Sequence, residues 1–150
     1  MCQKSRIIVT FTICFSIIAL TGFIFHNYEI IKVQGQSMAP TLNHGQFLIA
    51  DKTYGNLDYS DIIIFDINKS EFSGRAIKRI AAMQGDSIKI EHHQLLINDS
   101  IIQDYECAIE NIEYTLNEGE LFVLGDNSEG STDSRDFGPI SIKNVIAVYR

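Results

Sequence analysis

The chain has 150 residues, of which 45% are hydrophobic and 21% are charged. This length and composition predict one folded domain with a single core rather than several domains. The formal net charge is −7 at pH 7, and because the first 25 residues hold two cations and no anion, residues 26–150 carry −9. Such an acidic surface excludes nucleic acid as the expected partner and gives no general attraction to anionic lipid headgroups.

An uncharged apolar run occupies residues 7–25, and as a helix it is about 28 Å long, enough to cross a bilayer once. Lys4 and Arg6 precede the run, so the positive-inside rule places residues 1–6 in the cytoplasm and residues 26–150 outside. We therefore expect a single-pass anchor in the cytoplasmic membrane, with a mitochondrial inner membrane as the alternative location. A cleaved secretory signal is the competing interpretation, but no small-x-small site closes the run.

The cysteines and histidines do not indicate a disulfide or a metal centre. Cys2, Cys14 and Cys107 fall before, inside and beyond the apolar run, so no two of them share an oxidising compartment if this topology holds. The four histidines are not joined to cysteines or carboxylates at ligand spacing. We expect neither a metal nor an organic cofactor.

Beyond the apolar run the pattern predicts short strands separated by turn signals such as residues 43–45, 84–86 and 125–127. The expected fold is mainly β, with antiparallel sheets folded into a barrel or sandwich-like catalytic body behind one transmembrane helix. Residues 99–118 are predicted to be the least regular part, a reduced and variable excursion between two strands. The expected strands are residues 29–33, 46–51, 61–66, 75–82, 87–91, 94–97, 120–124 and 144–149.

Ser37 is the first candidate for chemistry, because it follows a predicted strand and precedes Pro40, which can open a short helix or turn. A serine in that place can present its hydroxyl at a strand end. Serines before such turns also commonly cap backbone groups, so this placement does not by itself distinguish a nucleophile. No histidine is set beside an acidic residue in a way that would make it the base for Ser37.

Lys78 is the candidate base, because it interrupts an apolar strand. At an ordinary pKa of about 10.4 only roughly one lysine in 2,500 is neutral at pH 7, and burial lowers the pKa by disfavouring the ammonium form. A buried Lys78 can thus take a proton from serine near neutral pH. Most strand lysines face solvent, so the strand alone leaves both interpretations open.

Three blocks in order resemble the type I signal peptidase family, the serine-lysine leader peptidases, in its short Gram-positive-like form. The first is Val33-x-Gly35-x-Ser37-Met38-x-Pro40-Thr41-Leu42, and the second is Ile77-Lys78-Arg79. The third, Gly125-Asp126-Asn127 with Ser131-x-Asp133-Ser134-Arg135-x-x-Gly138, is similar to a long signature of that family. The chain departs from the family pattern at Ser60. This serine stands directly before Asp61, at a position where glycine is usual in the family.

This resemblance implies a serine endopeptidase that removes signal peptides from secretory preproteins after a small-x-small site of the Ala-x-Ala kind. Ser37 resembles the nucleophile, Lys78 the general base and Ser131 the hydroxyl that orients the lysine. The resemblance also implies a substrate that lies extended beside residues 32–36 and 75–78, with Ile31, Met38 and Ile77 as candidate pocket residues. The residues that resemble the supporting charged groups are Arg79, Asp126, Asp133 and Arg135.

Some family members carry a serine two positions before the nucleophile, and Gly35 stands there in this chain. The backbone N–H of Ser37 is then the expected oxyanion donor. The expected reaction passes through an acyl-enzyme, with Lys78 taking the proton of Ser37 and later activating a water.

Two other functions stay open at this point. One is a non-catalytic or client-dedicated assembly factor for surface proteins. The other is a self-cleaving serine-lysine repressor, which has a similar local serine-methionine-x-proline element but a cytosolic, DNA-linked setting. The apolar run, the acidic domain and the third block count against the repressor.

Overall fold

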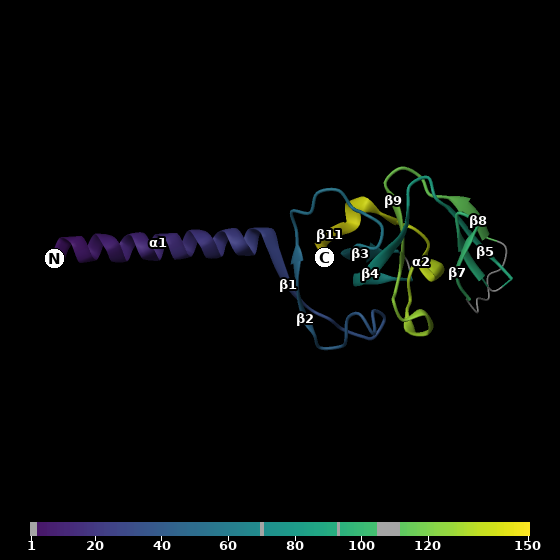
Figure 1. Ribbon diagram of the computed structural model, residues 1–150, viewed down its shortest axis with the longest axis horizontal. Coiled ribbons are helices and arrows are strands. Elements are labelled where there is room, and N and C mark those ends of the chain that lie inside the picture. Colours follow the sequence, from purple (N-terminus) through teal and green to yellow (C-terminus); the bar gives the residue numbers. More distant parts are fainter. Residues whose placement is uncertain (1–2, 70, 93, 105–111) are drawn as a thin grey trace.

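The computed structural model describes residues 3–69, 71–92, 94–104 and 112–150. A long helix projects from one end of a β-rich body, and the second of two sheets lies at the opposite end (Figure 1). The helices and short helical turns are α1 (Gln3–Asn27), η1 (Ser128–Gly130), α2 (Ser134–Phe137) and η2 (Ile142–Asn144). The strands are β1 (Tyr28–Lys32), β2 (Phe47–Asp51), β3 (Ile62–Asn68), β4 (Ser73–Met83), β5 (Ser87–Glu91), β6 (Gln94–Ile97), β7 (Ser100–Asp104), β8 (Ile112–Thr115), β9 (Glu120–Leu124), β10 (Ile140–Ser141) and β11 (Val145–Tyr149).

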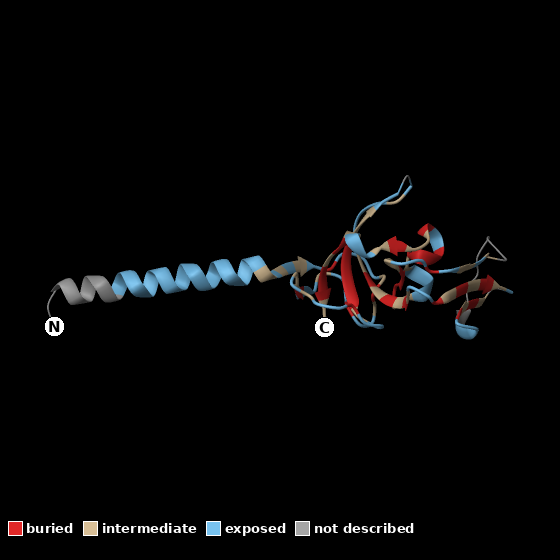
Figure 2. Cartoon of the chain, turned by 90° about the horizontal axis from the view of Figure 1, so that it is seen from above, coloured by how far each residue is buried: buried red, intermediate tan, exposed pale blue. Residues whose placement is uncertain are grey.

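Helix α1 stands apart from the body and is exposed along its described side chains (Figure 2). Its window Thr10–Asn27 has a mean hydropathy of 1.5, and none of it is buried. By length and composition this helix is able to cross a membrane. Cys14 is exposed on α1, whereas Cys2 and Cys107 lie outside the described residues.

The larger sheet has seven strands in the order β1-β2-β11-β3-β4-β9-β10, and the pairs between neighbours are antiparallel. Its strand β3 begins with four consecutive buried residues, which alternate between two core clusters on opposite faces. Ile62 and Ile64 join the cluster around Met38, and Ile63 and Phe65 join the one around Val123. A strand covered on both faces requires such an unbroken apolar run.

The smaller sheet has four strands in the order β7-β6-β5-β8 and packs against β4 and β9 through a third core cluster. Two of these strands lie within residues 99–118, which were predicted to be the least regular part, and neither strand was predicted. Strand β7 pairs with β6, and β8 pairs with β5, so both ends of the segment are regular. Their alternation was too short to detect, because each strand has only four or five residues. Residues 105–111 of the predicted excursion lie outside the described part.

The other predicted strands are confirmed to within two residues at each end, and the short β10 was not predicted. The mainly antiparallel β fold with one N-terminal apolar helix is also confirmed. Ser60 adopts a left-handed backbone with φ of 70°. That conformation explains why a glycine suits this place before Asp61, since glycine adopts positive φ without steric cost.

Candidate active site

The turn that carries Ser37 is fixed to the body by its apolar side chains. Met38 and Leu42 are buried in the cluster that also holds Val33, while Ser37 itself is only half-buried. Within the turn, Leu42 N–H donates to Met38 O at 2.8 Å. The buried side chains of Met38 and Leu42 therefore anchor the turn, while Ser37 stays partly accessible.

Lys78 lies in the middle of β4, where it is in register with Ile63 of β3, and only 4% of its surface is exposed. Burial lowers the pKa of this lysine below its ordinary value, and the nearby Asp133 carboxylate opposes the shift only in part. At a given pH, a larger fraction of Lys78 is thus uncharged than of an exposed lysine. The strand pattern left open whether Lys78 faces solvent or the interior, and the structure buries it.

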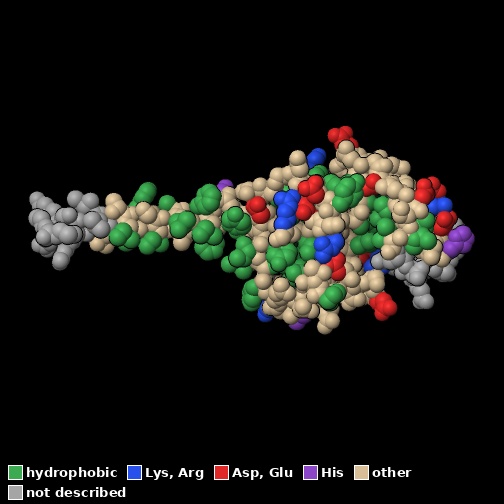
Figure 3. Space-filling model, viewed as in Figure 1, with side chains coloured by type: hydrophobic (Ala, Val, Ile, Leu, Met, Phe, Trp, Pro, Cys, Tyr) green, Lys and Arg blue, Asp and Glu red, His purple; other side chains and the backbone are tan. Residues whose placement is uncertain are grey.

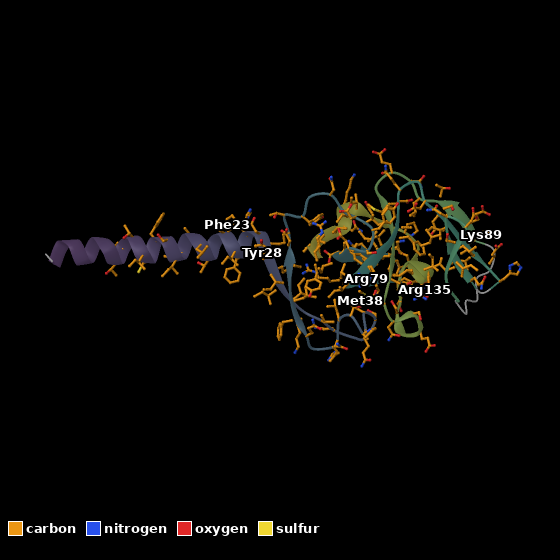
Figure 4. The ribbon with its side chains drawn as sticks, viewed as in Figure 1. Phe23, Tyr28, Met38, Arg79, Lys89 and Arg135 are labelled. Atoms are coloured by element: carbon orange, nitrogen blue, oxygen red, sulfur yellow. The ribbon has the colours of Figure 1, made fainter. Side chains whose placement is uncertain are left out.

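Ser37 and Lys78 line the same cavity, which has a volume of about 470 Å³. One wall comes from the segment that runs from β1 into the Ser37 turn, and the other comes from the first half of β4. Ile31, Met38 and Ile77, the three side chains expected in the pockets, are all among its lining residues. The size is typical of sites that bind small ligands or a few residues of peptide. In the view with side chains, Met38, Arg79 and Arg135 are all in the β-rich body, away from Phe23 and Tyr28 at the helix end (Figure 4).

The third sequence block folds against the Ser37 turn. Asn127 N–H donates to Ser37 O at 3.0 Å, and its side-chain amide donates to Gln36 O at 3.2 Å. A Cβ atom on Gly125 would lie 2.1 Å from Ser131 Oγ and 2.5 Å from Ser37 O. Only glycine fits there without a shift of the backbone. The roles of Gly125 and Asn127 were missed from sequence, although both stand in the quoted block.

Asp133 is fully buried and contacts several other residues of this block. Its carboxylate accepts from Gly125 N–H at 2.9 Å, from Ser131 Oγ–H at 2.8 Å and from Arg135 Nε at 2.7 Å. Asp133 also caps α2 by accepting from the backbone N–H of Arg135. One carboxylate thus holds the loop of Gly125, the hydroxyl of Ser131 and the first turn of α2 in one arrangement.

The second charged pair joins Arg79 to Asp126. Arg79 Nε and Nη2 donate to the two carboxylate oxygens at 2.8 and 2.7 Å. Burial raises the pKa of Asp126, but the hydrogen bonds from Arg79 and Thr41 outweigh it and lower that pKa below its ordinary value. The four residues expected to support the site therefore form two separate pairs, Arg79 with Asp126 and Arg135 with Asp133.

Comparison with known proteins gives the family. The family model described as signal peptidase, peptidase S26, matches residues 3–150. The chain belongs to the signal peptidase family, peptidase S26. This membership confirms the family predicted from the three blocks.

Relatives come from bacteria and from chloroplasts. The chain is 34% identical to signal peptidase I U of Bacillus subtilis over 89% of its own length and 81% of that protein. It is 36% identical to the probable thylakoidal processing peptidase 2 of Arabidopsis thaliana over 79% of its length, and it spans only 36% of that longer protein. Thylakoidal processing peptidase 1 is similarly spanned over 40% of its length.

A solved signal peptidase I from Enterococcus faecalis V583 matches with a TM-score of 0.50, covering 65% of this chain and 100% of that one at 24% identity. This likeness is evidence for the fold alone.

Proposed function

We propose that this protein is a membrane-anchored serine endopeptidase that removes signal peptides from exported preproteins, with Ser37 as nucleophile and Lys78 as general base. The observation that carries the proposal is the shared cavity, on which a turn serine and a buried strand lysine both open. A lysine in that setting is costly to fold unless it is neutral or paired, and such perturbed groups cluster at functional sites.

In the proposed reaction the neutral amine of Lys78 takes the proton of Ser37 Oγ, and the oxygen attacks the scissile carbonyl carbon. The backbone N–H of Ser37 donates to the oxyanion that forms. As the amide C–N bond breaks, the ammonium of Lys78 returns the proton to the leaving amine and an acyl-enzyme remains. Lys78 then takes a proton from water, whose oxygen attacks the ester carbon. As the ester C–O bond breaks, the ammonium of Lys78 returns the proton to Ser37 Oγ, which restores the free serine and the neutral lysine.

Ser131 is proposed to orient Lys78. Its hydroxyl proton is directed to Asp133, so the lone pairs of Ser131 Oγ are available to accept from the lysine amine. A hydroxyl acceptor fixes the direction of the amine while the amine stays neutral. A carboxylate in the same place would favour the charged ammonium form. The pairs Arg79–Asp126 and Arg135–Asp133 are proposed to hold the loops that carry these groups.

The cleft suits an extended peptide. Strand β1 is an edge strand that pairs only with β2, and residues 73–78 of β4 pair only with β3 among the described strands. Both walls of the cavity therefore have backbone groups free to align a substrate strand. Ile31, Met38 and Ile77 provide an apolar floor that would accept the small side chains of an Ala-x-Ala site.

Anchoring by α1 is proposed, with residues 1–6 in the cytoplasm and the catalytic domain of residues 26–150 outside. The body is tied to the helix end, because Lys52 Nζ donates to Phe25 O at 2.8 Å. Hydrophobic side chains continue from α1 onto the adjoining end of the body (Figure 3), where Ile30, Phe47 and Ile49 are each more than 60% exposed. These features support a site held close to the outer leaflet, where a signal peptide leaves the membrane.

The test is cleavage of a purified precursor with an Ala-x-Ala signal by the full chain in liposomes. We expect cleavage at that site by the wild type and none by Ser37→Ala or Lys78→Ala, with both variants folded. Lys89→Ala is the matched control, because Lys89 lies on β5 of the smaller sheet, paired with Glu91. Activity of either site variant at the wild-type level would refute the assigned roles. Absence of cleavage by the wild type would favour the assembly-factor function.

A further inference from the structure

An ion pair joins the two strands, β1 and β4, that contribute residues to opposite walls of the cavity. Arg75 Nη1 of β4 lies 2.7 Å from Glu29 Oε1 of β1. These two strands are not neighbours in the sheet, because β2, β11 and β3 stand between them in the strand order. The contact is thus a side-chain bridge over a gap that no backbone hydrogen bond closes.

The Arg75 guanidinium is held from the other side as well. Asp66 of β3 is in register with Arg75, and its Oδ1 lies 3.5 Å from Arg75 Nε. The planar guanidinium can use different N–H groups for the two carboxylates. Arg75 is therefore fixed to its own sheet by Asp66 while it reaches Glu29 across the gap.

The bridge stands at the helix end of the cleft. Glu29 is the second residue after Asn27, where α1 ends. Arg75 lines the cavity and precedes Lys78 by three residues, about 10 Å along an extended strand.

We propose that the Glu29–Arg75 pair is a clasp that fixes the separation of β1 and β4, so that an extended peptide can align with both walls. The inference rests on the proposed function, since it concerns the substrate of that same cleft. Neither residue touches the reacting atoms, so both are positioning residues. Without the clasp, β1 is paired to the sheet through β2 alone among the described strands, and the substrate must itself order the gap when it binds.

The clasp acts on binding and leaves the chemical step alone. Glu29→Gln and Arg75→Gln should each raise KM for the precursor by about 1.5- to 5-fold, the range that partly exposed ion pairs contribute, with kcat unchanged. The double variant should be no worse than either single one.

The dependence of KM on ionic strength distinguishes the clasp from a merely structural role, which would leave that dependence unchanged. The pair is 45% and 31% exposed, so ions screen it. Wild-type KM should rise with ionic strength toward the value of Arg75→Gln, while KM of that variant changes less. Arg150→Gln is the matched control, because it breaks an ion pair with Asp61 in which the arginine is 49% exposed, away from the cleft residues.

Peptide binding by the full chain with Ser37→Ala, measured by fluorescence anisotropy with a labelled Ala-x-Ala peptide, separates the clasp from the chemistry. Weaker binding when Glu29→Gln or Arg75→Gln is added supports the clasp even where no cleavage occurs. Unchanged binding, additive effects of the two substitutions, or an equal effect of Arg150→Gln overturns it while leaving the proposed function intact. Absence of peptide binding by any form, with no cleavage by the wild type, overturns both.

Discussion

Replacing Asp133 with asparagine tests how far the site depends on its buried charge. The side chains of Asp133 and Arg135 are 0% and 1% exposed, and the carboxylate accepts from Gly125, Ser131 and Arg135. Asparagine keeps the volume but offers one acceptor oxygen, and its amide N–H groups point at other donors. The guanidinium then has a neutral neighbour in place of its carboxylate.

Breaking a buried ion pair from one side costs about 3–5 kcal/mol. Domains of this size are stable by about 5–15 kcal/mol, so the substitution removes a large share of the total. We expect that loss in the free energy of unfolding, together with loss of cleavage because Ser131 and the Gly125 loop are released. A drop in activity without a drop in stability would mean that the carboxylate acts only on the chemistry.

The measurement is urea denaturation of the full chain in detergent micelles, followed by tyrosine fluorescence and circular dichroism. The control is Glu91→Gln, which breaks an ion pair with Lys89 whose side chains are 28% and 33% exposed. That change should cost less than about 1 kcal/mol. If Asp133→Asn costs no more than Glu91→Gln, the argument from burial is wrong.

Three further outcomes are expected. Gly125→Ala should lower kcat by about 100-fold or more while the chain stays folded, because the new Cβ would press on Ser131 Oγ and Ser37 O; wild-type kcat in a precursor assay would contradict this. Burial lowers the pKa of Lys78, so the folded chain binds fewer protons than the unfolded chain between that lowered pKa and 10.5. The rate of cleavage should therefore rise with pH up to the lowered pKa. The free energy of unfolding should fall as the pH drops from 10.5 toward that lowered pKa, and Lys78→Met should lack this pH dependence. Arg79→Lys should lose the two-point contact with Asp126 and lower activity more than stability, as paired kinetic and denaturation measurements would reveal.

Local patterns were sufficient for much of this fold. The apolar run, the turn residues and the β-branched strands follow from short-range rules, because side-chain spacing and backbone preference act within a few residues. The three blocks also identified Ser37 and Lys78 as candidates. What the strand around Lys78 did not reveal was which way the lysine faces, since that depends on the elements that cover it.

The sequence by itself determined the long apolar helix, most strands and the family, since each of these follows from contiguous residues. Only the tertiary structure decided that Arg79 pairs with Asp126 and Arg135 with Asp133, and that Glu29 of β1 meets Arg75 of β4. The Arg79–Asp126 pair depends on the pairing of β4 with β9, and the Glu29–Arg75 pair depends on how the seven-stranded sheet brings β1 close to β4. Strand order and register are set by the sum of many long-range packing contacts, so no local pattern carries them.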